Sequence, residues 1–256
     1  MNLTKYLEDH DITISHALLT HWHGDHTGGL SDLLAYDPAI IVHKNKSEQK
    51  QQPIMDGQIF RVQGATLRAV LTPGHATDHT CFILEEENAL FTGDNVLGHG
   101  FSVAEDLTEY TRSLRSMASF ECMVGYPGHG AVIHDLPQVM KRYIAQRDFR
   151  EQQIYSALVR GASARQSCHS ASSNSNIIHG YVADGDEEKH GRTRGVDGLS
   201  VTDISTIVYG ELTRDSGTFE SALKPVLNQV LFMLADHGKA TWEMVERCGT
   251  RYWSPR

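Results

Sequence analysis

Residues 18–30, LLTHWHGDHTGGL, place three histidines and one aspartate within six consecutive positions, directly after an apolar run. These four side chains are His21, His23, Asp25 and His26. The preceding run, ISHALLT, is typical of a buried strand. Alternate residues of an extended segment point the same way, so His21 and His23 can meet one ion, and Gly24 then lets the chain turn. The fold must therefore end a strand at a cluster of ligand-type side chains.

Three later segments repeat this arrangement, because each ends a predicted strand with a ligand-type residue at a turn. They are TPGH at 72–75, FTGD at 91–94 and YPGHG at 126–130, which supply His75, Asp94 and His129. Imidazole nitrogens and carboxylate oxygens are ligands of a borderline-soft divalent metal, usually zinc. Strand ends of this kind can converge on one pocket at the edge of a sheet. The alternative is that these residues only cap strand ends.

Strand patterns and helix patterns alternate along the first 160 residues. Strands are expected at 39–44, at 58–75 as a hairpin around Gly64, and at 80–96 as a pair around an acidic turn. Helices are expected at 106–117 and from about 136 to 158. This alternation predicts an α/β architecture.

The composition changes at residues 161–198, which are polar, rich in Ser and Gly, and of mixed charge. This stretch is interpreted as a polar linker or inserted loop. It would separate a catalytic domain at 1–160 from a small helical unit at 199–256. Two helices are expected in that unit, with Pro225 as a kink in the second.

Composition narrows the class of protein. The net charge of −9 disfavours a broad electrostatic contact with nucleic acid. The four cysteines are far apart and form no CxxC pair, so a reduced setting is expected. No apolar stretch approaches the roughly 18 residues that cross a bilayer, and the N-terminus does not have a secretory signal pattern. The protein is therefore expected to be cytoplasmic and to have no membrane contact.

The motif order H-x-H-x-D-H, T-P-G-H, T-G-D and P-G-H-G resembles the metallo-β-lactamase superfamily, over residues 14 to about 135. The resemblance implies an αβ/βα sandwich, followed by a small C-terminal helical unit that is similar to a winged helix. In this superfamily several strands precede the first motif, whereas here only 20 residues precede His21. The sandwich is therefore expected to lack N-terminal strands.

The resemblance also implies the cofactor and the role of each ligand. Two Zn²⁺ ions are expected. His21, His23 and His75 would hold the first ion, Asp25, His26 and His129 the second, and Asp94 would bridge both. Two such ions lower the pKa of water and polarise a carbonyl group. Asp25 would be the catalytic residue that exchanges a proton during hydrolysis.

The segment ENALFTGDNVLGHG is similar to fungal lactamase-like thioesterases that release polyketides from an acyl carrier protein. The function expected is therefore a zinc-dependent thioesterase of secondary metabolism, with the acyl carrier protein of a polyketide synthase as partner. An alternative is an endoribonuclease of the lactamase-beta-like type. Residues 203–247 carry seven acidic and four basic residues, which disfavours a track for phosphates. A glyoxalase-type hydrolase and an inactive, truncated metal-binding remnant are further alternatives.

Three further residues lie beside the motifs. Asp78 and His79, in ATDHT, are interpreted either as residues that orient a ligand or as a surface pair. Trp22 lies between two ligands in the sequence, so it must face away from them and is expected in the core.

Overall fold

The computed structural model describes residues 3–172, 198–210, 217, 219–245 and 250–256. The chain divides into two compact units, Met1–Arg147 and Asp148–Arg256. Each unit is described by itself below. The predicted domain boundaries at 160 and 198 stay predictions.

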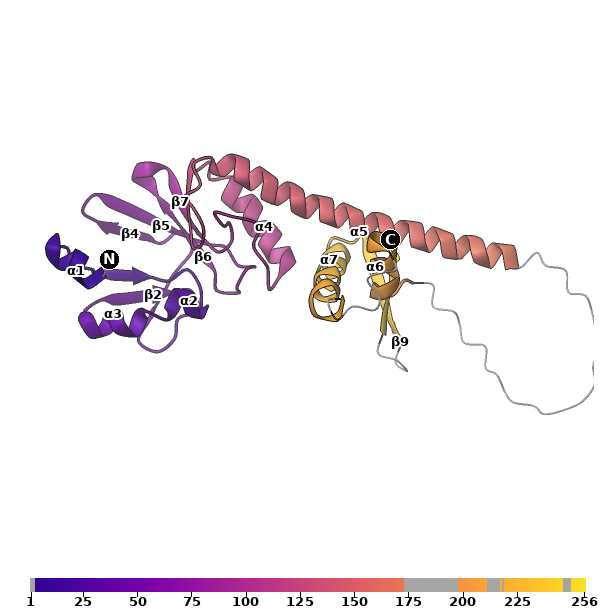
Figure 1. The fold of residues 1–256 in the computed structure, drawn as a ribbon, viewed down its shortest axis with the longest axis horizontal. Helices are drawn as coiled ribbons and strands as arrows, with labels where there is room; N and C mark the ends of the chain where they lie inside the picture. The colour runs from indigo at the N-terminus through magenta and orange to yellow at the C-terminus, as the bar shows by residue number, and fades with distance from the viewer. Residues whose placement is uncertain (1–2, 173–197, 211–216, 218, 246–249) are drawn as a thin grey trace, which may run out of the picture. The chain divides into compact units, whose positions relative to one another are not determined.

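The first unit holds two sheets, and the smaller one carries the histidine-rich segment (Figure 1). Its strands are β1 (His16–Leu18), β2 (Ile41–Lys44) and β3 (Gln52–Pro53), all parallel, in the order β1-β2-β3. Three short helices belong to the same part of the chain: α1 (Leu3–Asp9), α2 (Gly24–Thr27) and α3 (Leu30–Tyr36). The expected strand over 14–20 is therefore shorter, and helix α2 begins within the cluster of ligand-type residues.

The larger sheet has five strands in sequence order. They are β4 (Ile59–Val62), β5 (Ala65–Leu71), β6 (Thr80–Leu84), β7 (Ala89–Gly93) and β8 (Val124–Pro127). All neighbours are antiparallel except β7 and β8. Gly64 has a φ of 82° in the β4–β5 turn, a left-handed conformation that suits glycine. The acidic turn between β6 and β7 is a 3₁₀ helix, Glu85–Glu87. Both predicted strand pairs are confirmed.

An apolar cluster joins the two sheets. Leu18 of β1 packs with Ile54, and with Ala69 and Phe82 from the larger sheet. Helix α4 (Leu107–Ala118) covers β6, where Met117 Sδ lies 4.0 Å from Cys81 Sγ. Burial of these side chains is the main force that holds the sheets together. It fixes the strand ends that carry the ligand-type residues.

Helix α4 begins as the sequence predicts. Asp106 is its N-cap, and the Asp106 carboxylate accepts a hydrogen bond from the backbone N–H of Glu109. Tyr110 and Leu114 lie on the buried face of the helix. The Tyr110 hydroxyl donates to the carbonyl of Asn95 at 2.6 Å. The helix therefore supports the turn that follows β7.

The expected end of the long helix at residue 158 is wrong, because α5 runs from Leu136 to Ser172. Once a long helix is formed, each added residue gains a hydrogen bond without a new nucleation cost, so the helix can continue into a polar, Ser-containing stretch. In the second unit Arg165 of α5 also forms an ion pair with Asp203 at 2.9 Å. The first twelve residues of the predicted linker are therefore helical. Residues 173–197 lie outside the described part of the chain.

In its described residues, the second unit adds two α-helices and a pair of antiparallel strands to the end of α5. The elements are α6 (Val201–Tyr209), a π-helical turn (Phe219–Leu223), α7 (Lys224–Asp236), and the antiparallel strands β9 (Ala240–Val245) and β10 (Thr250–Pro255). Pro225 lies in the first turn of α7 and so marks a helix start. Trp253 of β10 is fully buried. Among the described residues, no helix is both long enough and apolar enough to cross a membrane.

Candidate metal centre

The seven predicted ligand-type residues all follow strands of the first unit, and Asp25 and His26 lie in helix α2. His21 comes three residues after β1, His75 four after β5, Asp94 directly after β7, and His129 two after β8. The structure brings their side chains into two neighbouring groups, within each of which the ligand atoms lie within 4.8 Å of one another. The first group is His21, His23, His75 and Asp94, and the second is Asp25, His26 and His129. Their roles as metal ligands remain a proposal.

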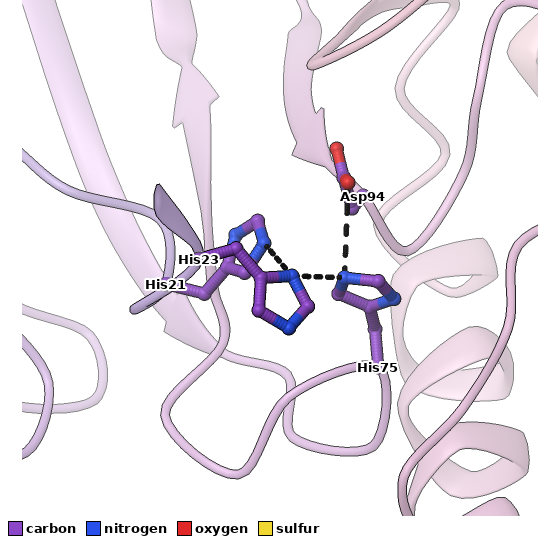
Figure 2. A group of neighbouring side chains, drawn as sticks. All are labelled: His21, His23, His75 and Asp94. Carbon is purple, nitrogen blue, oxygen red and sulfur yellow. Dashed lines mark hydrogen bonds and ion pairs between the residues drawn. The ribbon is translucent and has the colours of Figure 1, made fainter. Parts of the chain in front are cut away.

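Three imidazole nitrogens meet in the first group (Figure 2). His23 Nδ1 lies 2.9 Å from His21 Nε2 and 3.1 Å from His75 Nε2. His21 is completely buried and His75 nearly so. In a tetrahedral zinc site with Zn–N bonds of about 2.0–2.1 Å, neighbouring nitrogens are about 3.3 Å apart. The three nitrogens are thus placed slightly closer than they would be around a zinc ion.

The second group is connected to the first through Asp94. His129 Nε2 lies 3.0 Å from Asp25 Oδ2 and 3.3 Å from His26 Nε2. Asp94 Oδ1 lies 3.3 Å from His26 Nε2, and Asp94 Oδ2 lies 3.4 Å from His129 Nε2 and 3.7 Å from His75 Nε2. The Asp94 carboxylate therefore lies between the two groups, where it can contact an ion in either one.

The charge state of the first group suits a cation. Burial, together with the neighbouring imidazoles of His26, His75 and His23, lowers the pKa of His21 from 6.5 to about 3. The ring is therefore neutral near pH 7, with lone pairs available for a metal. Asp94 Oδ1 is buried and makes no hydrogen bond within the described residues. A buried carboxylate oxygen without a hydrogen-bond donor is costly unless it binds an ion. The residues present therefore fit a divalent metal ion.

Hydrogen bonds behind the group orient the imidazole rings. His75 Nδ1 lies 3.0 Å from the carbonyl oxygen of Val103, and His21 Nδ1 lies 3.0 Å from Thr20 Oγ1. Because a carbonyl can only accept, His75 carries its proton on Nδ1 and leaves the Nε2 lone pair free. Such outer contacts fix the tautomer of histidines that bind metals.

Asp25 is the exposed member of the second group. A hydrogen bond involving its own backbone N–H lowers the pKa of the Asp25 carboxyl, and the imidazoles of His26 and His129 add to this effect. The carboxylate is therefore ionised near neutral pH. Its exposure lets it reach a molecule that approaches from solvent.

The interpretation of Asp78 and His79 as a surface pair is wrong, because both are buried. His79 Nε2 accepts a hydrogen bond from the backbone N–H of Asp94 at 3.1 Å. Asp78 pairs with Lys44 at the end of β2, where Lys44 Nζ lies 3.0 Å from Asp78 Oδ2. The pattern around His75 could have indicated His79, which follows it by four residues. Nothing in the sequence links Lys44 to the site.

The expectation that Trp22 lies in the core is also wrong, since half of its surface (50%) is exposed. Its ring packs edge-on against His23, with centroids 4.5 Å apart. Strand β1 ends at Leu18, so alternation does not hold at Trp22, and the ring contacts His23 instead of facing away from the candidate ligands. Trp22 therefore contributes an apolar surface beside the candidate centre.

Comparisons with known proteins show the family of the chain. The family model described as the metallo-beta-lactamase superfamily matches residues 3–129. Thioesterase pkgB of Emericella nidulans is 58% identical over 245 residues, which cover 93% of this chain and 71% of that protein. Lactamase-like protein aptB of the same fungus is 50% identical over 244 residues, covering 94% of this chain and 70% of that protein.

Two solved structures share the fold. A metallo-beta-lactamase family protein from Thermus thermophilus matches with a TM-score of 0.62 and 19% identity, over 99% of this chain and 85% of that one. A beta-lactamase domain protein from Burkholderia ambifaria matches with a TM-score of 0.65 and 15% identity, over 98% and 77%. At these identities the likeness concerns the fold alone, and it confirms the α/β fold that the motifs predict.

Proposed function

Because the chain belongs to the metallo-beta-lactamase superfamily, we propose that it is a zinc-dependent thioesterase acting on an acyl-carrier-protein-bound polyketide thioester in secondary metabolism. The observation that carries the proposal is the convergence of seven histidine and aspartate side chains on two neighbouring groups that share Asp94. The name of the fungal relative at 58% identity, a thioesterase, supports the substrate class. Members of this superfamily bind metal ions and are hydrolases, which supports the reaction type.

We assign one ion to the first group and one to the second, with Asp94 able to contact both. When bound, a pair of zinc ions polarises the thioester carbonyl and lowers the pKa of water towards neutrality. In the first group, burial keeps the His21 ring neutral, and contacts with Thr20 and Val103 orient the rings of His21 and His75. These residues therefore set the geometry of the centre before substrate arrives, so that little reorganisation is needed during the reaction.

Asp25 is the group we assign to proton transfer. Its carboxylate is exposed, lies 3.0 Å from His129 Nε2, and is ionised near neutral pH. It can accept a proton from the water that attacks the acyl carbon. It can then return that proton to the sulfur that leaves, so that acid and thiol are the only products. Positioned acid–base groups of this kind typically contribute about 10²–10⁴-fold to a rate.

The test is hydrolysis of acyl-carrier-protein thioesters and of a simple acyl thioester by the zinc-loaded protein, measured as thiol released. Asp25→Ala is expected to lose about 10²–10⁴-fold in kcat. Asp32→Ala is the matched control, because Asp32 is an exposed aspartate of α3 outside both groups. Zinc-loaded protein that ignores thioesters but cleaves single-stranded RNA would overturn the proposal. So would protein that binds zinc and hydrolyses neither substrate.

A further inference from the structure

His79 lies buried behind the turn that carries Asp94, and the proposed reaction does not use it. Both of its ring nitrogens have partners. The backbone N–H of Asp94 donates to His79 Nε2 at 3.1 Å, and His79 Nδ1 lies 2.9 Å from Thr72 Oγ1. Because a backbone N–H can only donate, Nε2 holds the lone pair and Nδ1 holds the proton. Thr72 then accepts from Nδ1 and directs its own proton to Cys81 Sγ at 3.2 Å.

We propose that His79 is a positioning residue: by accepting the backbone N–H of Asp94, it holds the Asp94 carboxylate between the two groups of histidines. It acts through Asp94 and has no exposed surface with which to touch a substrate. The inference rests on the proposed metal centre, in which Asp94 is the shared ligand.

The turn before Asp94 is shaped to receive the ring. Gly93 has a φ of 49°, and a Cβ at this position would lie 2.6 Å from His79 Nε2. Glycine both permits this backbone conformation and leaves the space that the imidazole fills. The ring and the turn therefore fit together through direct contact, and the hydrogen bond to Asp94 is one part of that contact.

The position of Asp94 affects both groups at once. Its Oδ1 is 3.3 Å from His26 Nε2, and its Oδ2 is 3.4 Å from His129 Nε2 and 3.7 Å from His75 Nε2. A shift of the turn would change the contacts to all three imidazoles. Loss of the support from His79 should therefore weaken metal binding as a whole, since groups that orient metal ligands typically contribute about 10–100-fold to affinity.

Two amide variants separate the contact with Asp94 from the contact with Thr72. In His79→Gln the side-chain oxygen can reach the place of Nε2 and accept from Asp94. In His79→Asn the shorter amide can reach only the place of Nδ1, so it keeps the contact with Thr72 and loses the one with Asp94. The probes are Zn²⁺, titrated by calorimetry, and Co²⁺, followed by its absorption spectrum.

His79→Asn is expected to bind both metals about 10–100-fold more weakly than the wild type. Its cobalt spectrum should also change, because the coordination of the ion changes. His79→Gln is expected to recover most of the affinity and the wild-type spectrum. Equal losses in the two variants, or no loss in His79→Asn, would overturn the inference.

The wild-type protein provides a test that does not depend on the folding of a variant. In ¹⁵N-labelled, zinc-loaded protein, a scalar coupling across the hydrogen bond is expected between the Asp94 amide nitrogen and His79 Nε2, with the ring proton on Nδ1. Absence of that coupling, or a proton on Nε2, contradicts the inference. None of these measurements uses a thioester. A protein with the coupling and the metal affinities but no hydrolysis would contradict the proposed function alone.

Discussion

Gly128 lies directly against Asp94: a Cβ at position 128 would be 2.4 Å from Asp94 Oδ1 and 2.7 Å from His26 Cε1. The backbone N–H of Gly128 also donates to the carbonyl of Gly93 at 2.9 Å, which ties the β8 turn to the β7 turn. The absence of a side chain at 128 is thus what allows these two ligand-bearing turns to approach each other.

Gly128→Ala should therefore weaken zinc binding by tenfold or more, because the new methyl group displaces the Asp94 carboxylate or the His26 ring; outer contacts to metal ligands contribute about 10–100-fold. Calorimetric titration with Zn²⁺ measures the change. Gly29→Ala is the matched control, since a Cβ there meets nothing within 4 Å. Wild-type affinity in Gly128→Ala would show that Asp94 is not held where the structure places it.

The buried ion pair of Lys44 and Asp78 should make the stability of the fold sensitive to the loss of either partner. Their side chains are only 5% and 2% exposed and lie 3.0 Å apart. Lys44→Met leaves the Asp78 carboxylate buried without a cation, and is expected to lower the free energy of unfolding by about 3–5 kcal/mol. Urea denaturation measures this change in the free energy of unfolding. Lys5→Ala breaks the exposed pair with Asp9 and should change stability by less than about 1 kcal/mol. Similar small effects at both sites would contradict this assignment.

Stability of the metal-free protein should fall as the pH is lowered from 6.5 towards 3. The pKa of His21 in the folded state is about 3, below its ordinary value of 6.5, so the unfolded chain binds more protons within this window. The contribution of His21 to the free energy of unfolding is complete above pH 6.5 and is lost as the pH falls towards 3. Urea denaturation across this range, with chelator present, gives the slope. In His21→Gln the slope of the unfolding free energy against pH should decrease by an amount equivalent to up to about one bound proton. An unchanged slope would contradict the prediction.

Removal of metal should lower the thermal unfolding midpoint. An ion that binds only the folded state, present at 100 times its Kd, stabilises that state by about 2.7 kcal/mol. Calorimetry with and without a chelator should show the shift, and added Zn²⁺ should reverse it. Mg²⁺ at the same concentration should not, because it prefers oxygen ligands and the first group is rich in imidazole. A midpoint that changes neither with chelator nor with added Zn²⁺ would contradict the proposed metal centre.

The seven ligand-type residues could be found from the sequence because each follows a strand in a short local pattern. The sequence leaves the role of His79 open between two interpretations and does not indicate Lys44, because both residues depend on contacts between distant segments. His79 meets an amide 15 residues away in the sequence. Lys44 resembles any lysine at a strand end until the fold brings Asp78 to it.

The other differences between the sequence-based expectations and the structure also have physical reasons. The polarity of residues 161–172 predicts a linker, yet α5 continues through them, because extending a formed helix costs less than starting one. Alternation along a strand predicts that Trp22 faces away from the ligands, but β1 ends at Leu18 and the Trp22 ring contacts His23. The structure also leaves half of that residue exposed.

The short distance between each strand end and its first ligand has a consequence for how such a protein can change. His21, His75, Asp94 and His129 all lie within four residues of a strand end, so the sheets fix the positions of these candidate ligands. The segments beyond them, 95–106 and 130–135, connect to helices, and they also contain contacts that support the candidate ligands, such as the Val103 carbonyl beside His75. Exchange of the other residues in these segments, with such contacts kept, should therefore redirect substrate preference while the candidate metal centre is retained, which makes the scaffold suited to evolutionary diversification and to engineering of its loops.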